Sequence, residues 1–221
     1  MKLSSETVRI LKHFSNLNRG IEFKAGNNLA TISASQTILA EAVLEDSFPE
    51  DFCVEDLSQF LSVNSLFAGG AELEFDESNV VFKNEKSTIK YRKTAKEMII
   101  VPPYKGGDLD MADTPKINLT AKDFEWIQKT AAVLASPHIA FESDGDGIYV
   151  VTYDMTCDSA HVNKIRISDG DGTEYKVVFS TANLNILSGD YEVVLSVNGL
   201  GHFKNLSTNI QYWIAAEVRN S

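Results

Sequence analysis

An amphipathic helix is predicted from the stretch Leu119-Thr120-Ala121-Lys122-Asp123-Phe124-Glu125-Trp126-Ile127-Gln128-Lys129-Thr130-Ala131. Thr120 followed three residues later by Asp123 is typical of a capped helix start. Apolar residues then recur at spacings of three and four, which places them on one side: Phe124, Ile127, Ala131 and Leu134. Lys122 and Lys129 are seven residues apart and share a face roughly opposite that stripe. The helix therefore combines a core-facing side with a basic outer side.

A second helix of the same kind is predicted near the start of the chain, from about Leu3 onward. Its core side carries Ile10, Leu11, Phe14 and Leu17, and its outer side carries Arg9, Lys12, His13 and Asn16. Each of the two helices stands at the head of one half of the chain. Both have basic groups on the side that faces away from the core.

The length of 221 residues is enough for one large domain or two of about 110. A hydrophobic fraction of 43%, spread throughout, predicts a folded chain rather than a disordered one. The sequence has no run of about 18 apolar residues and no apolar signal core, so we expect no membrane partner and no secretion. The two cysteines, Cys53 and Cys157, favour a reducing compartment without a disulfide framework.

The charge of the whole chain is strongly negative, with 20 basic and 31 acidic side chains and a formal net charge of −11. Such a charge argues against nonspecific nucleic-acid binding unless the positive groups are segregated onto one surface. Acidic residues do cluster, in the stretches Glu41–Asp51 and Glu72–Glu77, while the two predicted helices are basic outside. The sequence therefore allows a segregated basic surface.

The first half of the chain mixes short alternating strands with helices. After a helix stop at Arg19-Gly20, strands are predicted at Ile21–Ala25, Leu29–Ser33 and Thr37–Leu44. Another helix begins near Val54, has Leu57, Phe60, Leu61 and Phe67 on its apolar side, and ends at Gly69-Gly70. Four further strands are predicted at Ala71–Phe75, Asn79–Lys83, Ser87–Tyr91 and Glu97–Val101.

The clearest break in the sequence is Pro102-Pro103-Tyr104-Lys105-Gly106-Gly107. Two prolines and two glycines without an apolar period are typical of a linker between domains. We expect a first domain at residues 1–101, a linker at 102–113 and a second domain at 114–221.

The second half repeats the order of the first. Around the Thr120 helix and a short helix at Thr181–Leu187, strands are predicted at Lys116–Leu119, His138–Glu142, Gly147–Tyr153, Val162–Ile167, Thr173–Phe179, Tyr191–Val197, Gly201–Lys204 and Gln211–Glu217. The shared order predicts a structural duplication without visible residue identity. In each half, we expect two helices to cover the same side of a sheet.

Motifs for catalysis or cofactors are missing from the sequence. Asp144-Gly145-Asp146-Gly147 and Asp169-Gly170-Asp171-Gly172 look like calcium loops, but position 12 of each is Met155 or Ser180 instead of Glu. Between strands, Asp-Gly pairs are better explained as hairpin turns. The four histidines are scattered, and no nucleophile elbow, Walker loop or dinucleotide fingerprint occurs. We therefore predict no metal, no cofactor and no enzymatic activity.

Two of these features have simpler explanations. Lysines at helical spacing are usually only solvated surface, and the middle helices, with Ser58, Gln59 and Ser62 outward in the first half, lack basic groups. Tyr212 and Trp213 are more often core residues than part of a groove. Two equivalent basic helices in one acidic chain nevertheless favour a functional surface.

The arrangement resembles a known family, the DNA sliding clamps, most closely the homotrimeric processivity clamps of contractile-tailed phages. The similar positions are Met1-Lys2-Leu3-Ser4 through Leu11-Lys12 and Phe14, then Gly20-Ile21, Asp56-Leu57 with Phe60-Leu61 and Ser65-Leu66, Gly170-Asp171-Gly172 with Phe179 and Asn183, and Gly189-Asp190-Tyr191. The resemblance implies an α+β fold of two tandem DNA-clamp domains, each with two helices on a β-sheet, that assemble into a ring.

The function that this resemblance implies is to encircle double-stranded DNA without reading its sequence and to tether a DNA polymerase. Helices would line the hole, so the resemblance implies that Lys2, Arg9, Lys12, Lys122 and Lys129 face phosphates. The protein would work at the replication fork in the cytoplasm of an infected bacterial cell. Three copies would form the ring, and no membrane would be involved.

Two further surfaces are implied by the same resemblance. Tails of the polymerase and the clamp loader would enter a hydrophobic groove near the linker, bordered by Ile100, Val101, Pro102, Tyr104 and Trp213. Edge strands would pair between subunits, with Ile99 in Glu97–Val101 of one subunit and Ile165 in His161–Ile167 of its neighbour.

Three other protein classes remain open at this point. A monomeric processivity factor would need a more basic face to hold DNA by affinity than a chain of net charge −11 offers. A β-rich phage structural protein would use the helices only to cover a sheet. An acidic hydrolase would have to work with carboxylates that form no recognisable motif.

Overall fold

The computed structural model describes residues 1–109, 111, 116–157, 159–196 and 199–217. The chain divides into two compact units, Met1–Lys105 and Gly106–Ser221. This division falls inside the segment 102–113 that the sequence predicts as a linker. Parts of that linker (110 and 112–113), the start of the predicted second domain (114–115) and position 197, where a strand was expected to end, lie outside the described residues.

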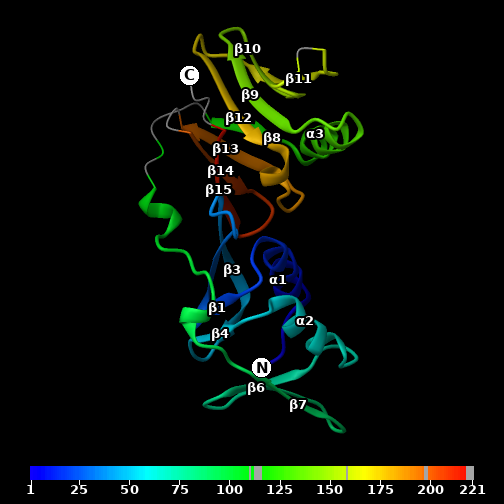
Figure 1. The fold of residues 1–221 in the computed structure, drawn as a ribbon, viewed down its shortest axis with the longest axis vertical. Coiled ribbons are helices and arrows are strands. Elements are labelled where there is room, and N and C mark those ends of the chain that lie inside the picture. The colour runs from blue at the N-terminus through cyan, green and yellow to red at the C-terminus, as the bar shows by residue number, and fades with distance from the viewer. Residues whose placement is uncertain (110, 112–115, 158, 197–198, 218–221) are drawn as a thin grey trace. The chain divides into compact units, whose positions relative to one another are not determined.

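The first unit contains two α-helices and seven strands among its described residues, shown in blue to green in Figure 1. In chain order they are α1 (Ser5–Leu17), β1 (Ile21–Phe23), β2 (Gly26–Ile32), β3 (Ile38–Phe48), β4 (Phe52–Val54), α2 (Leu57–Ser65), β5 (Glu72–Phe75), β6 (Asn79–Lys83), β7 (Thr88–Arg92) and the 3-10 helix η1 (Lys96–Met98). Antiparallel pairing gives the strand orders β4-β1-β2-β3 and β5-β6-β7. Helices α1 and α2 lie against each other (Figure 1).

The second unit has one α-helix and eight strands in the part that the structure describes. They are η2 (Gly106–Asp108), β8 (Lys116–Leu119), α3 (Ala121–Val133), β9 (His138–Asp144), β10 (Gly147–Tyr153), β11 (Asn163–Asp169), β12 (Glu174–Ser180), the 3-10 helix η3 (Thr181–Leu184), β13 (Tyr191–Ser196), β14 (Leu200–Asn205) and β15 (Ile210–Ala215). The strand orders are β11-β10-β9-β12 and β15-β14-β13-β8, all antiparallel.

Each unit is itself built from two similar halves. In the second unit, β8-α3-β9-β10-β11 and β12-η3-β13-β14-β15 have the same order, and the first strand of each half pairs with the sheet of the other half, β8 with β13 and β12 with β9. In the first unit, β4 likewise pairs with β1. The missing first strand of that unit is replaced by the N-terminal residues, because Leu73 N donates to Met1 O at 2.6 Å and the Met1 amine donates to Leu73 O at 2.8 Å.

The two predicted basic helices are confirmed as α1 and α3. Ser4 caps α1 by accepting from Thr7 N at 3.1 Å, and Thr120 Oγ1 caps α3 by accepting from Asp123 N at 3.1 Å. Their apolar stripes are buried as expected, through Ile10, Leu11 and Phe14 in α1 and Phe124, Ile127 and Ala131 in α3. Local capping and periodicity therefore suffice to define both helices.

Aromatic clusters form the core of each unit. In the first unit, Phe23 lies with its ring centroid 4.6 Å from those of both Phe48 and Phe52. In the second unit, Phe203 contacts Phe141 and Phe179 at centroid distances of 5.8 and 5.6 Å. All six rings are almost completely buried, and aromatic contacts of this kind stabilise a core beyond simple burial of apolar area.

The predicted strand Glu97–Val101 is wrong. The segment contains the 3-10 helix η1, and Ile100 O accepts from the side chain of Asn18 (2.8 Å) instead of joining a ladder. Ile99 lies against Gly20, where an added Cβ would come within 2.5 Å of Ile99 Cγ2. Because Gly20 has no side chain, Ile99 packs directly against its backbone inside the first unit. The alternation of apolar and polar residues in the sequence does not predict this contact.

The predicted short helix Thr181–Leu187 is reduced to η3, four residues in 3-10 conformation. Contacts with other elements hold both ends of this turn. Thr181 donates from its amide to Pro137 O (2.9 Å) and from its hydroxyl to Ser136 O (2.8 Å), while Leu184 O accepts from Gln128 of α3 (3.1 Å). Among its described residues, the second unit consequently presents one α-helix where the sequence predicts two.

Strand β4 was not predicted. Its three residues, Phe52, Cys53 and Val54, are all buried and therefore show no alternation. Pairing with β1 forms this strand, with Phe23 opposite Phe52.

Candidate nucleic-acid interface and partner surfaces

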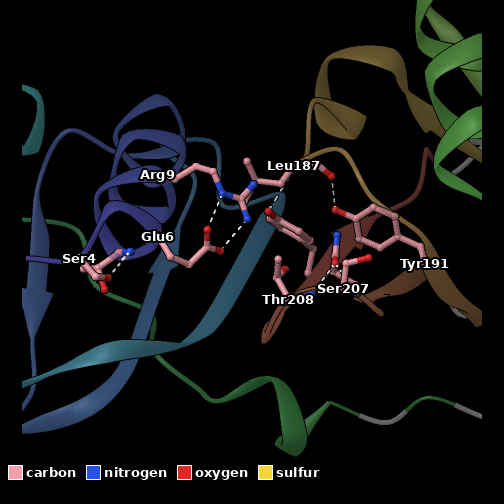
Figure 2. A network of polar contacts seen from close by, with 10 residues as sticks. Ser4, Glu6, Arg9, Leu187, Tyr191, Ser207 and Thr208 are labelled. Carbon is pink, nitrogen blue, oxygen red and sulfur yellow. Dashed lines mark hydrogen bonds and ion pairs between the residues drawn. The ribbon is translucent and has the colours of Figure 1, made fainter.

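The outer face of α1 carries Arg9 and Lys12, both exposed. Arg9 is held by an acid on its own helix, because its Nε and Nη2 donate to the two carboxylate oxygens of Glu6 at 2.8 and 2.6 Å (Figure 2). These hydrogen bonds also keep the pKa of Glu6 below its usual value. Since the pair is exposed, it contributes little stability, yet it offsets the positive charge that Arg9 presents.

The outer face of α3 shows the same compensation. Lys122 and Lys129 are both exposed, as predicted. Lys129 Nζ lies 2.6 Å from Glu125 Oε1, one helical turn earlier, and this contact lowers the pKa of Glu125. None of the ion pairs found within the described ranges involves Lys2, Lys12 or Lys122. Among the five predicted DNA-facing residues, these three lysines are therefore the ones found in no ion pair in the described part of the chain.

His13 differs from its predicted outward position. Its side chain is half-buried, and burial together with the charge of Arg9 lowers the pKa of His13 to about 4. At neutral pH it is an uncharged part of the helix packing and adds no positive charge to the face of α1.

The remaining helical surfaces are neutral. The exposed residues along α2 are Ser58, Gln59, Ser62 and Ser65, and η3 is a turn of uncharged residues. Among the α-helices and η3, the exposed cations therefore lie on α1 and α3.

The predicted groove residues belong to both units. Ile100, Val101, Pro102 and Tyr104 are in the first unit, where Ile100 and Tyr104 are 44% and 42% exposed. Trp213 belongs to the second unit and is only 5% exposed. Its ring stacks on His202 with a centroid distance of 4.5 Å, and His202 Nε2 lies 3.0 Å from Gln211 Oε1.

Gly106 explains why Trp213 is covered. A Cβ added at Gly106 would lie 2.2 Å from Trp213 Cη2, so the backbone of η2 rests directly against the indole ring. Gly107, the next residue, has nothing within 4 Å of such a Cβ. The two glycines of the predicted linker thus differ: Gly106 packs against Trp213, whereas Gly107 has space for a side chain.

Two strands with an unpaired outer edge matter for self-association. Within the described residues, β7 pairs only with β6 and β11 only with β10. Ile165 lies on β11, as predicted, whereas Ile99 lies outside any strand. The edge of the first unit is therefore β7, where Ile89 and Tyr91 alternate with the exposed Thr88, Lys90 and Arg92. That alternation is visible in the sequence, but the edge position is not.

A polar cavity of about 470 Å³ lies beside the end of β7. Its lining includes Arg19, Asp56, Gln59, Tyr91 and Arg92. Tyr91 donates from its hydroxyl to Asp56 O at 3.0 Å, and Arg19 Nε lies 3.2 Å from Asp56 Oδ2. The cavity is therefore formed where the start of α2 meets the edge strand.

The two Asp-Gly motifs lie side by side, but only the one at residues 144–147 is a hairpin turn, because it joins the paired strands β9 and β10. The hairpin predicted at residues 169–172 is wrong, since β11 pairs with β10 and β12 pairs with β9 in the described chain. Gly170 N donates to Asp146 O at 2.9 Å, Gly172 N donates to Gly145 O at 3.0 Å, and Gly145 and Gly172 both have φ of 87°. In the described parts of the chain, no group of three or more His, Cys, Asp or Glu side chains is arranged to hold a metal ion. Nor does a helix in these parts have the length and apolar character that crossing a membrane requires.

The hydrogen bonds around β13 show how the second unit supports the base of α3. Tyr191 donates from its hydroxyl to Leu187 O, and Ala121 N at the start of α3 donates to Asp190 Oδ1 at 2.7 Å (Figure 2 shows the first contact). Phe124 of α3 packs edge-on against the Tyr191 ring with a centroid distance of 5.5 Å. The helix that carries Lys122 and Lys129 is thus fixed to the sheet at its first turn.

Comparison with known proteins identifies relatives along the entire chain. A family model described as DNA polymerase processivity factor matches residues 4–101. The sliding clamp of Vibrio phage KVP40 is 31% identical over 223 residues, covering 99% of this chain and 100% of that protein. The sliding clamp of Escherichia phage RB69 is 30% identical and that of Enterobacteria phage T4 is 27% identical, each over 99% of this chain and 97% of the relative.

Solved structures show the same fold at low sequence identity. A. fulgidus PCNA, solved with the C-terminal region of FEN-1 bound, superposes with a TM-score of 0.70 at 17% identity, over 100% of this chain and 98% of that one. The Helicobacter pylori beta clamp superposes with a TM-score of 0.71 at 14% identity, over 99% of this chain and 65% of that one.

Proposed function

The chain belongs to the sliding clamps, and we propose that it closes with copies of itself into a ring that encircles duplex DNA and tethers a DNA polymerase to it. The observation that carries this conclusion is the similarity to the sliding clamp of phage KVP40 along the full length of both proteins. The two units of repeated strand–helix architecture agree with it. The alternative of a β-rich virion protein is not favoured by these relatives.

DNA would pass through the ring without contacts to base edges, so the protein needs no sequence specificity. We assign the phosphate-facing role to Lys2, Arg9, Lys12, Lys122 and Lys129. Exposure of the four helix residues on α1 and α3 supports this assignment. The ion pairs of Arg9 with Glu6 and of Lys129 with Glu125 keep the attraction weak, which suits a protein that must slide.

Ring closure would join the two unpaired edges, β7 of one subunit and β11 of the next, in a homotrimer. On β7, Ile89 and Tyr91 point to the same side of the sheet, and on β11, Ile165 and Ile167 do so. Pairing of the two edges would bring these apolar residues together and satisfy the open backbone groups. Ile165 keeps its proposed interface role, and Ile89 and Tyr91 replace Ile99 as its expected neighbours.

The partners other than DNA would be the polymerase and the clamp loader. We keep the hydrophobic groove of Ile100, Val101, Pro102, Tyr104 and Trp213 as their proposed docking site. The exposure of Ile100 and Tyr104 supports this role, since exposed apolar side chains are typical of peptide-binding surfaces. Because Gly106 covers Trp213, binding at that residue would require η2 to move.

The proposal includes no catalytic activity, in keeping with a tethering role. It places the protein in the cytoplasm of an infected bacterial cell, where phage DNA is replicated. The clamp domains are taken as residues 1–101 and 114–221, joined by the linker 102–113, and the division of the chain between Lys105 and Gly106 supports these limits.

The test combines mass and topology. Light scattering at micromolar concentration should give about three times 24.4 kDa. After incubation with clamp loader and ATP, the protein should co-elute with nicked circular DNA, and a polymerase should extend primers further before dissociating. A protein that neither assembles nor increases the length of DNA made per binding event would contradict the proposal.

A further inference from the structure

Trp126 is a large aromatic side chain on the outer surface of α3, and it is 56% exposed. Its indole Nε1 lies 3.4 Å from Asn163 Oδ1, which turns the ring toward the first residue of β11. Val162, immediately before this strand, is also an exposed large hydrophobic residue. Exposed tryptophans of this kind are the residues that most often anchor protein interfaces.

The position of Trp126 relates it to the open edge of the second unit. Asn163 starts β11, whose outer edge is unpaired among the described residues. On this strand Lys164 and Arg166 are exposed, whereas Asn163 and Ile165 are half-buried on the side that α3 covers. Trp126 therefore flanks the beginning of the edge strand, on its helix-covered side.

The first unit has a cavity at the corresponding place on its own edge. The cavity of about 470 Å³ adjoins Tyr91 and Arg92 at the end of β7 and is also lined by Asp56 and Gln59 at the start of α2. It thus lies on the side of β7 that α2 covers. Its volume falls within the roughly 300–1,000 Å³ of pockets that enclose small ligands, which is ample for one indole ring.

Antiparallel pairing aligns these two features. All strand ladders within each unit are antiparallel, so the same direction is expected where β7 of one subunit meets β11 of the next. The last residues of β7 then lie opposite the first residues of β11, with Tyr91 opposite Asn163. Side chains opposite each other face the same side of a sheet, so Tyr91 and Asn163 both point toward the helices.

We propose that Trp126 of one subunit enters the cavity beside β7 of the next subunit, against Arg19, Gln59 and Tyr91. This inference rests on the proposed ring and adds a specific anchor to it. The Arg19 guanidinium and the Tyr91 ring offer a cation–π contact and an aromatic edge contact to the indole. The strand pairing gives the interface its direction, and the tryptophan fixes its register.

The first experiment uses Trp126 as its own reporter. Trp213→Phe leaves Trp126 as the single tryptophan, since the chain has two. Emission wavelength and acrylamide quenching are followed through a dilution series, with mass measured by light scattering at each concentration. We expect blue-shifted, protected emission in the trimer and a red shift that coincides with dissociation.

Three results would overturn the inference. A trimer in which acrylamide quenches Trp126 as strongly as in the monomer would refute the anchor while leaving the ring intact. An emission change that occurs only when DNA is loaded would assign Trp126 to the DNA instead. A chain that stays monomeric at all concentrations, even with loader and DNA, would refute the ring and the anchor together.

A set of variants tests the cavity. Loss of a central interface tryptophan typically weakens binding by roughly 30-fold or more, so Trp126→Ala should weaken subunit association by about that factor. Met98→Ala is the matched control, because Met98 is 69% exposed but lies in η1. Arg19→Ala should weaken association in the parent and have little further effect in Trp126→Ala. Full additivity of the two changes, or a larger effect of Met98→Ala, would contradict the proposed contact.

Discussion

Single residues on α1 and α3 would set how strongly the proposed inner surface attracts DNA. The sequence shows the lysines and arginines, but their effective charge depends on which acids lie next to them. Arg9 and Lys129 each contact a glutamate on the same helix, whereas Lys12 and Lys122 are found in no ion pair of the described chain. Helix α3 therefore allows two opposite substitutions: removal of the cation Lys122 and neutralisation of the acid Glu125, which contacts Lys129.

Opposite changes on α3 are expected to shift clamp–DNA interaction in opposite directions. Lys122→Glu should reduce clamp loading on the order of tenfold, because each subunit of the ring loses one exposed phosphate contact. Glu125→Gln frees Lys129 and should increase loading and slow sliding. Loading is measured by retention on nicked circular DNA at several salt concentrations. Unchanged loading with Lys122→Glu at low salt would contradict the DNA-facing assignment.

His13 links packing to acid stability. Its pKa is about 4 in the folded chain, below the ordinary value of 6.5, so the unfolded chain binds an extra proton between these pH values. Stability from this residue is therefore complete above about pH 6.5 and is lost as the pH falls toward 4. Allowing for partial solvent screening, we expect a loss of about 1–2 kcal/mol.

The measurement is urea unfolding between pH 4 and 7 for the parent and for His13→Gln. Carboxylates with lowered pKa values, such as Glu6 and Glu22, lose stabilisation in the same range, but they do so in both proteins. The difference between the two proteins isolates His13. Asn16→Gln, at an exposed site of the same helix, is the control and should keep the parent's pH dependence. Equal slopes for parent and His13→Gln would show that His13 is not buried in the neutral form.

At the scale of elements, η2 is the segment whose packing decides access to Trp213. Gly106→Ala places a Cβ about 2.2 Å from the ring, which cannot be accommodated, so η2 must move away. With Trp126→Phe as background, Trp213 emission should shift to longer wavelength and its quenching by acrylamide should increase. Gly107→Ala, with nothing within 4 Å, should leave both unchanged. An unaltered spectrum in Gly106→Ala would mean that η2 does not cover Trp213 in solution.

The proposed role of β7 and β11 in ring closure depends on the hydrogen-bonding partner that each strand lacks on its outer edge in the described chain. Each is paired on one side only within the described residues, and such edges promote association unless they are blocked. Neither strand contains proline, and their half-buried residues Ile89, Ile165 and Ile167 are apolar. They are therefore suited to pairing with another copy of the chain.

For the whole molecule, the retention of a ring on DNA is topological rather than a matter of affinity. A trimer would carry three times the net charge of −11, so electrostatic attraction alone cannot hold it on DNA. Once loaded on nicked circular DNA, the protein should remain bound at high salt. Cutting the DNA once should release it within minutes. Release by salt before cutting would instead indicate binding by charge, as in a monomeric processivity factor.

Local sequence patterns determined much of this protein. Capping by Ser4 and Thr120 and the apolar stripes that follow them define α1 and α3, and period-two alternation locates most of the strands. The prolines and glycines near position 105 mark the division between the units. The exposure of Lys122, Lys129 and Arg9 follows from the same helical periodicity. These features depend on neighbours within a few residues, so the sequence alone is sufficient to predict them.

Long-range contacts decided the rest. Ile99 packs against the backbone of Gly20, so the segment Glu97–Val101 does not form the predicted strand. Hydrogen bonds at both ends of η3 limit this segment to a single turn. The exchange of β8 and β12 between sheets, the edge positions of β7 and β11, the burial of His13 and the covering of Trp213 likewise arise from partners distant in the chain. The periodicity of the sequence predicts which side of a helix or strand is apolar. Which residues pack against that side depends on contacts between segments that are distant in the chain.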